Sequence, residues 1–215
     1  MAEQNFPLYE EGIAFLKRRD KKLAWLIGRI GKISHVDTKD DFQFFVEQIV
    51  GQMLSIKVAD VMIGRLTDYC RGTITVDAIC SLSVEEFRSL GISTRKAECI
   101  RQVAFMIRGG ALDFVQLRGL PDADIMKILT SIKGIGPWTA KMYLYKIHRL
   151  DVLPYEDLVF LSAYKWLYRT RNVKPEAVRH RCRKWSPYAS IAAMYLYAAY
   201  EEGLIGTEAP LLKDL

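Results

Sequence analysis

Residues 132–140 read Ile-Lys-Gly-Ile-Gly-Pro-Trp-Thr-Ala, and they separate two segments that are both typical of helices. In the segment before them, 122–131, the apolar residues recur on one helical face, and the two glycines that follow favour a tight turn. Pro137 fits the first position of a second helix, because the N–H that proline lacks has no partner there. The sequence therefore predicts a helix, a short hairpin and a second helix.

Such a hairpin leaves backbone N–H groups at the start of the second helix available to an anion. The helix dipole adds partial positive charge at the same point, and glycine lets a phosphate approach the backbone closely. Lys133, Lys141 and Lys146 add charge nearby. A plain corner between two helices, in which the glycines only permit the turn, fits the same residues.

The composition suits a folded protein that meets a polyanion. The chain has 215 residues, of which 50% are hydrophobic and 26% charged, with a formal net charge of +6. This is enough for one substantial core or for two small lobes, and the mild positive charge favours a partner such as nucleic acid. No window approaches the ~18 apolar residues of a membrane span, and the first residues do not resemble a secretory signal. We expect no membrane association, and a location in the cytoplasm with the nucleoid or, in a eukaryote, in the nucleus.

The cysteines and histidines give no sign of a metal site. The four cysteines show no Cys-x-x-Cys spacing, which favours reduced and mostly buried thiols; they are Cys70, Cys80, Cys99 and Cys182. The three histidines are scattered along the chain. We therefore expect no metal and no cofactor.

Almost every segment has the periodicity of a helix, which predicts an all-α protein. Ser83 and Glu86 form a capping-box pattern, and Arg95 and Lys96, near the start of a later helix, either contact a phosphate or face solvent. The expected helical segments are 10–18, 22–30, 41–54, 57–69, 82–90, 91–107, 112–117, 122–131, 137–147, 158–168, 174–185 and 188–201.

Two strings together resemble a known family. Residues 134–140 (Gly-Ile-Gly-Pro-Trp-Thr-Ala) and 151–158 (Asp-Val-Leu-Pro-Tyr-Glu-Asp-Leu) are similar to the helix-hairpin-helix (HhH-GPD) DNA glycosylases. Within them the match is to the AlkA-type 3-methyladenine DNA glycosylases, over residues 40–200 and without their N-terminal β-rich domain. The resemblance implies two helical lobes with the active-site cleft between them. Residues 1–38 would pack with the C-terminal lobe, 39–149 would form a central lobe with the hairpin, and 150–215 would form the C-terminal lobe.

The resemblance implies that Asp157 is the catalytic carboxylate. Cleavage of an N-glycosidic bond passes through a transition state close to an oxocarbenium ion, which a fixed carboxylate stabilises while it orients or deprotonates water. Asp157 also fits an ordinary N-cap for the helix that follows, and the two roles are compatible. Glu156 and Asp151 are alternative carboxylates that match the family position less well.

The family's base pocket corresponds to Trp138, Met142 and Met194. Relatives that are also lyases have a lysine at position 138, which forms a Schiff base with the sugar, so Trp138 implies a monofunctional enzyme. An aromatic face also attracts a purine made cationic by alkylation. The familiar pocket has Tyr and Trp where this chain has the two methionines, so we expect a less aromatic pocket. Plain core packing fits all three residues as well.

The resemblance also implies two DNA-contacting loops. The hairpin that contacts the DNA backbone would comprise Lys133, Gly134, Ile135, Gly136 and Thr139. The loop that enters the minor groove and fills the gap left by a flipped base would comprise Gln52, Met53 and Leu54. Met53 takes the wedge position, although a core methionine fits the same pattern. Gln52 would either contact the opposing strand or cap the end of the preceding helix.

These observations predict a monofunctional DNA glycosylase of base excision repair that acts on alkylated purines such as 3-methyladenine and 7-methylguanine. The same fold acting on a deaminated or oxidised base, and a non-catalytic helix-hairpin-helix DNA-binding protein, are the alternatives. The expected partner is double-stranded DNA with damaged bases, and we expect a monomer. Relatives of the endonuclease III type hold an iron–sulfur cluster on four closely spaced C-terminal cysteines. Only Cys182 lies in that region here, so no cluster is expected.

Overall fold

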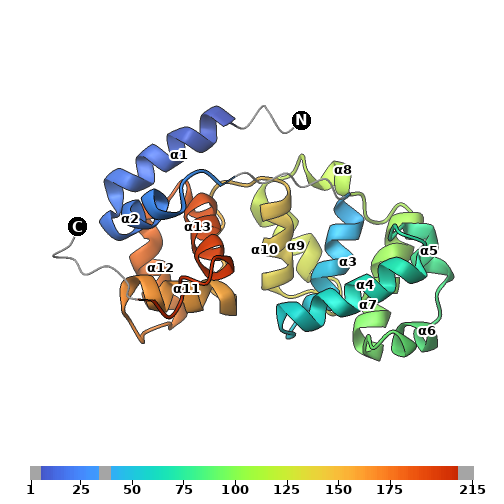
Figure 1. Cartoon of the computed structure of the whole chain (residues 1–215). Helices are drawn as coiled ribbons and strands as arrows, with labels where there is room; N and C mark the ends of the chain where they lie inside the picture. Colours follow the sequence, from blue (N-terminus) through green and yellow to red (C-terminus); the bar gives the residue numbers. More distant parts are fainter. Residues whose placement is uncertain (1–5, 34–39, 208–215) are drawn as a thin grey trace. The chain divides into compact units, whose positions relative to one another are not determined.

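The computed structural model describes residues 6–33 and 40–207, with side chains from residue 9 onward, and its regular structure there is helical (Figure 1). The one β feature within those ranges is an isolated bridge between Ile205 and Thr207. The all-α prediction is therefore confirmed. No helix in the described part of the chain is long and apolar enough to cross a membrane.

The chain divides into two compact units, which we call the terminal unit (1–37 and 148–215) and the central unit (38–147). The boundaries expected from the sequence were 38/39 and 149/150. The expected boundary at 38/39 lies outside the described residues, as do residues 1–5 and 208–215.

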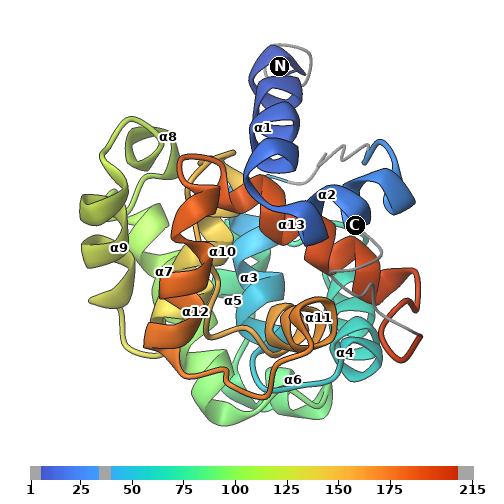
Figure 2. The same cartoon turned by 90° about the vertical axis from the view of Figure 1, so that its left-hand side faces the viewer.

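The terminal unit is built around one apolar helix. Eight residues of this helix, α13, are buried, as its nearly continuous apolar sequence predicts. It packs against α2 and α11 and also contacts α1 (Figure 1 and Figure 2). The helices of this unit are α1 (Phe6–Arg19), α2 (Lys21–Ile30), α11 (Leu158–Tyr168), α12 (Pro175–Cys182), the 3-10 turn η2 (Arg183–Trp185) and α13 (Ala189–Glu201).

The central unit has α3 at its core. This helix packs against α4, α7 and α10, and its Phe45 ring lies 5.5 Å from the ring of Phe114 and 6.1 Å from that of Tyr143. The helices of this unit are α3 (Asp41–Gly51), α4 (Ile56–Tyr69), α5 (Val76–Ser81), α6 (Val84–Ser89), α7 (Thr94–Arg108), α8 (Phe114–Leu117), α9 (Asp122–Thr130) and α10 (Pro137–Lys146).

Three differences from the expected helices have local causes. Helix α3 ends at Gly51 rather than at residue 54, because Gln52 with ψ +126° already leaves the helical conformation and Met53 follows with φ +57°. Helix α7 begins at Thr94 rather than at Gly91, whose φ is +92°. Helix α5 was not expected, because six residues are too few to show a helical period.

Candidate functional site

The hairpin between α9 and α10 depends on Gly134. Its φ is +96°, and a Cβ atom added there would lie 2.9 Å from the sulfur of Cys99. Gly136 is the N-cap of α10 and Pro137 opens that helix, as predicted. The backbone conformation and the close approach of α7 therefore both require glycine at position 134.

The side chains of the hairpin fall into two groups. Lys133 is exposed, whereas Ile135 and Thr139 are buried, with Thr139 only 1% exposed. Ile135 anchors the turn through its N–H, which donates to the carbonyl of Ile132 at 3.0 Å. The buried pair fixes the hairpin to the core of the central unit and leaves the lysine toward solvent.

Residues 52–54, which we call the wedge loop, join α3 to α4. Met53 is 94% exposed, so it is not a core methionine. Its φ of +57° is uncommon for a residue other than glycine. Leu54 is half-buried, and its N–H donates to the carbonyl of Gly51 at 3.1 Å.

The wedge loop and the hairpin are joined by hydrogen bonds within the central unit. The side-chain amide of Gln52 donates to the carbonyl oxygen of Gly134 at 3.2 Å and to Oγ1 of Thr139 at 2.9 Å. The amine of Lys96 donates to the carbonyls of Val50 and Gln52, both at 2.8 Å. In the structure the Gln52 side chain is thus engaged with the hairpin.

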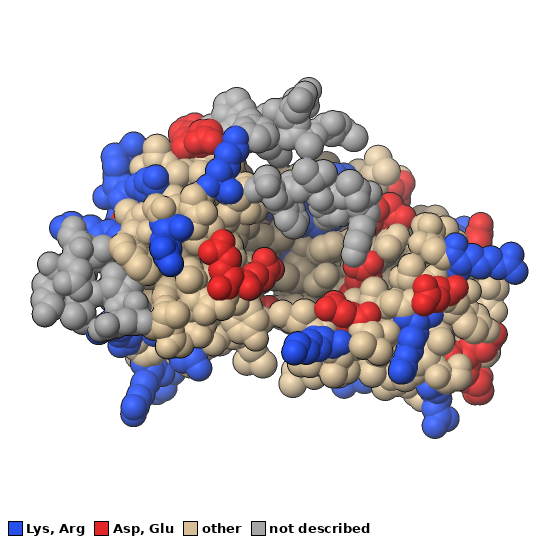
Figure 3. All heavy atoms as spheres, in the orientation of Figure 1, with Lys and Arg blue, Asp and Glu red and all other residues tan. Residues whose placement is uncertain are grey.

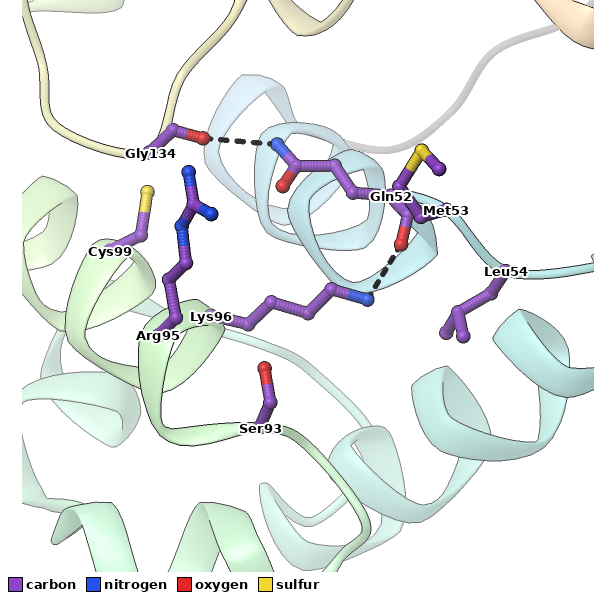
Figure 4. A pocket seen from close by; sticks show the side chains of 8 residues that line it. All are labelled: Gln52, Met53, Leu54, Ser93, Arg95, Lys96, Cys99 and Gly134. Atoms are coloured by element: carbon purple, nitrogen blue, oxygen red, sulfur yellow. Dashed lines mark hydrogen bonds between the residues drawn. The ribbon is translucent and has the colours of Figure 1, made fainter.

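A recess of about 330 Å³ lies beside the wedge loop (Figure 4). Arg95 and Lys96 give it positive charge, and none of its lining residues is a carboxylate. Burial lowers the pKa of the Lys96 amine. The recess is lined by Gln52, Met53, Leu54, Ser93, Arg95, Lys96, Cys99 and Gly134.

Asp157 is the N-cap of α11 in the terminal unit. Its Oδ1 accepts a hydrogen bond of 2.8 Å from the N–H of Phe160, and the residue is 9% exposed. The predicted N-cap is confirmed. The two alternative carboxylates differ from it: Glu156 is half-buried, and Asp151 is exposed and accepts hydrogen bonds from Ser186 and from the N–H of Ala189.

The three residues assigned to a base pocket are all half-buried. Trp138 and Met142 lie on α10 in the central unit, and Met194 lies on α13 in the terminal unit. Partial exposure distinguishes these three side chains from the fully buried residues around them on the same helices, such as Tyr143 and Tyr195.

Neither the distribution of surface charges nor the positions of the cysteines locates the site further. Basic and acidic side chains are mixed on the face seen in Figure 3 rather than gathered by sign. Each of the four cysteines is free, with Cys99 and Cys182 buried. Among the residues that the structure describes, no group of three His, Cys, Asp or Glu side chains is placed to hold a metal ion.

The sequence did not reveal that Lys96 bonds to the end of α3 and to the wedge loop. The chain pattern left a phosphate contact and simple exposure as the two possibilities, whereas the amine bonds to carbonyls 44 and 46 residues away. A lysine two residues into a helix has no local signal for such a partner. The packing of Cys99 against Gly134 was missed for the same reason.

Known proteins are similar to this chain in sequence and in fold. A family model described as HhH-GPD superfamily base excision DNA repair protein matches residues 46–187. DNA-3-methyladenine glycosylase 1 of Schizosaccharomyces pombe is 26% identical over 183 residues, which cover 82% of this chain and 80% of the relative.

Solved structures agree with this result. A crystal structure of DNA-3-methyladenine glycosidase from Bacillus halodurans is 33% identical and has a TM-score of 0.72, covering 87% of this chain and 89% of its own. The Schizosaccharomyces pombe glycosylase Mag1 in complex with abasic DNA is 24% identical with a TM-score of 0.81, over 89% of this chain and 97% of its own. The second likeness supports the fold alone.

Proposed function

This chain belongs to the HhH-GPD superfamily of base excision DNA repair proteins, and from that membership we propose that it is a monofunctional DNA glycosylase for alkylated purines. Its substrates would be bases of the 3-methyladenine and 7-methylguanine type, and its product DNA with an abasic site. The names of the relatives from Schizosaccharomyces pombe and Bacillus halodurans support this substrate class.

The observation that carries the proposal is the fixed carboxylate of Asp157. The hydrogen bond from Phe160 holds Oδ1, and burial leaves the side chain little freedom. A carboxylate held in this way stabilises the positive charge that develops on the sugar as the N-glycosidic bond breaks. It also orients or deprotonates the water that attacks the sugar carbon.

The residue at position 138 favours hydrolysis over lyase chemistry. A lyase needs an amine that attacks the sugar and forms a Schiff base, and the indole of Trp138 offers none. The half-buried ring would instead offer an aromatic face to a purine that carries positive charge after alkylation. Met142, on the same helix, and Met194, in the terminal unit, are apolar, so the residues assigned to base binding are less aromatic than those of the familiar family pocket.

Damaged double-stranded DNA is the partner in this proposal. Lys133, Gly134 and Gly136 of the hairpin would bind a phosphate through backbone N–H groups at the start of α10, since the N–H of Ile135 already donates to Ile132. Met53 would enter the gap left by the extruded base, since its exposed and adaptable side chain suits an apolar wedge. We propose a monomer without an iron–sulfur cluster that works in the nucleoid or, in a eukaryote, in the nucleus.

Base release from methylated duplex DNA tests the proposal. We expect the wild-type protein to free 3-methyladenine or 7-methylguanine, identified by chromatography, and to leave strands that break only after alkali or heat. Asp157→Asn should slow release by about 100- to 1,000-fold, because a charge that stabilises the transition state is lost. Asp113→Asn is a matched control, since Asp113 caps α8 in the same way but lies in the central unit.

Two results would count against the proposal. Bound DNA with no base released by the wild-type protein would leave the non-catalytic DNA-binding alternative. Equal rates for the wild-type protein and Asp157→Asn would remove Asp157 from the chemistry.

A further inference from the structure

Lys96 and Gln52 connect the wedge loop to two other parts of the central unit. Lys96 reaches from the first turn of α7 to the carbonyls of Val50 and Gln52. The amide of Gln52 reaches the other way, to Gly134 and Thr139 of the hairpin. Figure 4 shows the Lys96 amine bonded to the backbone carbonyl of Gln52, and the Gln52 side-chain amide bonded to the carbonyl of Gly134.

The position of the Lys96 amine suits a positive charge. Carbonyl groups at the end of a helix lack intrahelical donors, and the helix dipole makes that end partially negative. The amine lies at this end of α3 and donates to two such carbonyls at 2.8 Å. Lys96 is half-buried, so these bonds replace water that its amine has lost.

Met53 stands between two anchored neighbours. On one side Gln52 is held through both its carbonyl and its side-chain amide. On the other side, the N–H of Leu54 donates to Gly51. The left-handed conformation at Met53 is therefore imposed by its neighbours, because its own side chain is 94% exposed and has little to pack against.

We propose that Lys96 is a positioning residue that holds the wedge loop in the shape that presents Met53, and that Gln52 sets this loop in fixed register with the hairpin. The inference rests on the proposed glycosylase function. A wedge inserts at one step of the duplex while the hairpin holds a phosphate at another. A rigid link between them means that both contacts form together without further ordering of the loop.

Lys96→Met tests the role of the amine, because it removes the donor and keeps the apolar stem. We expect release of a fully paired methylated purine, at saturating enzyme in a single turnover, to slow by about 10- to 100-fold. Release of the same lesion from a mispaired site should slow by only about 3-fold or less, because extruding an unpaired base costs less. A general loss of stability would slow release from the paired and the mispaired site equally.

Two further variants serve as controls for the Lys96→Met measurement. Lys127→Met removes an exposed lysine of α9 in the same unit and should leave both rates unchanged. Lys96→Arg keeps donors and charge and should restore most of the rate on paired DNA. If Lys96→Met does not fold, Gln52→Leu, which removes the bonds to Gly134 and Thr139, takes its place in the same comparison.

A double-mutant cycle with Met53→Ala shows whether Lys96 acts through the wedge. We expect Lys96→Met to add little to the defect of Met53→Ala, because the positioning of an absent side chain has no effect. Defects that multiply would overturn the inference.

Amide hydrogen exchange of residues 51–56 separates this inference from the proposed function. In the free protein, Lys96→Met should speed exchange in these residues and leave exchange in α9 and α10 unchanged. Unchanged exchange in the loop would overturn the inference even if the wild-type protein releases bases. Faster exchange with no base release by the wild-type protein would contradict the proposed function alone.

Discussion

Two small regions of this protein differ in how they treat their side chains: one buries and pairs a charge, and the other exposes a large apolar group. The first, which we call the Asp20 cluster, comprises Asp20, Tyr168, Lys184 and Trp185 in the terminal unit. Oδ2 of Asp20 accepts hydrogen bonds from Tyr168 at 2.5 Å, Lys184 at 2.9 Å and Trp185 at 3.0 Å, and Oδ1 accepts the N–H of Leu23 at 3.2 Å. The carboxylate is 2% exposed, so a buried charge is matched by donors from α2, α11 and η2.

The wedge loop is the second region, and it has the opposite character. A large apolar side chain, Met53, is almost fully exposed on a backbone conformation that disfavours it. Neither feature stabilises the folded chain. The contrast supports the proposal that the wedge loop is kept for contact with DNA, whereas the Asp20 cluster stabilises the fold.

The largest effect on stability should come from Asp20→Ala. Loss of the carboxylate leaves the buried donors of Tyr168, Trp185 and the Leu23 N–H without their acceptor, which should lower the free energy of unfolding by about 2 to 4 kcal/mol. Urea unfolding measures the change. Met53→Ala, which changes an exposed side chain, should shift the same quantity by less than about 0.5 kcal/mol. Equal effects at the two positions would break the comparison.

Gly134→Ala should have the next largest effect on stability, and it tests the hairpin to which the wedge loop is bonded. The added Cβ would lie 2.9 Å from the Cys99 sulfur on a backbone with φ +96°, so we expect a loss of about 1 to 3 kcal/mol. Gly28→Ala is the matched control: Gly28 lies in α2 with nothing near an added Cβ, and alanine there should stabilise the helix by about 0.5 to 1 kcal/mol. A neutral Gly134→Ala would show that the hairpin can move away from α7.

The acid response of the Asp20 cluster should be smaller. Burial raises the pKa of Asp20, but the hydrogen bonds from Tyr168, Lys184 and Trp185 outweigh it, so the pKa lies below its usual range. A carboxyl with a lowered folded pKa contributes stability above its unfolded pKa and loses it as pH falls through the folded value. The stability difference between the wild-type protein and Asp20→Asn should therefore shrink as the pH falls below about 4. A difference that is constant from pH 7 to pH 3 would contradict the assignment.

The same contrast explains which features the sequence revealed. Helix α11 begins after Asp157 and ends at Tyr168 as predicted, and the Ser83–Glu86 capping box is present, because caps act within three residues. The end of α3 was misplaced, because Gln52 leaves the helical conformation where Lys96, Gly134 and Thr139 contact it, and these partners lie far away in the chain. The family resemblance supplied the positions of the candidate site. The bonds that join wedge loop and hairpin became visible only in the folded structure.

Met53→Gly should change stability little, and this variant tests the central claim most directly. Glycine relieves the left-handed backbone but adds freedom to the unfolded chain, so the free energy of unfolding should stay equal or rise by no more than about 1 kcal/mol. The measurement is single-turnover release of a paired methylated purine from duplex DNA by this folded variant. We predict a rate about 10- to 100-fold below that of the wild-type protein, because glycine cannot fill the gap left by the extruded base. Release at the wild-type rate would contradict the claim that the strained, exposed methionine is kept for base extrusion.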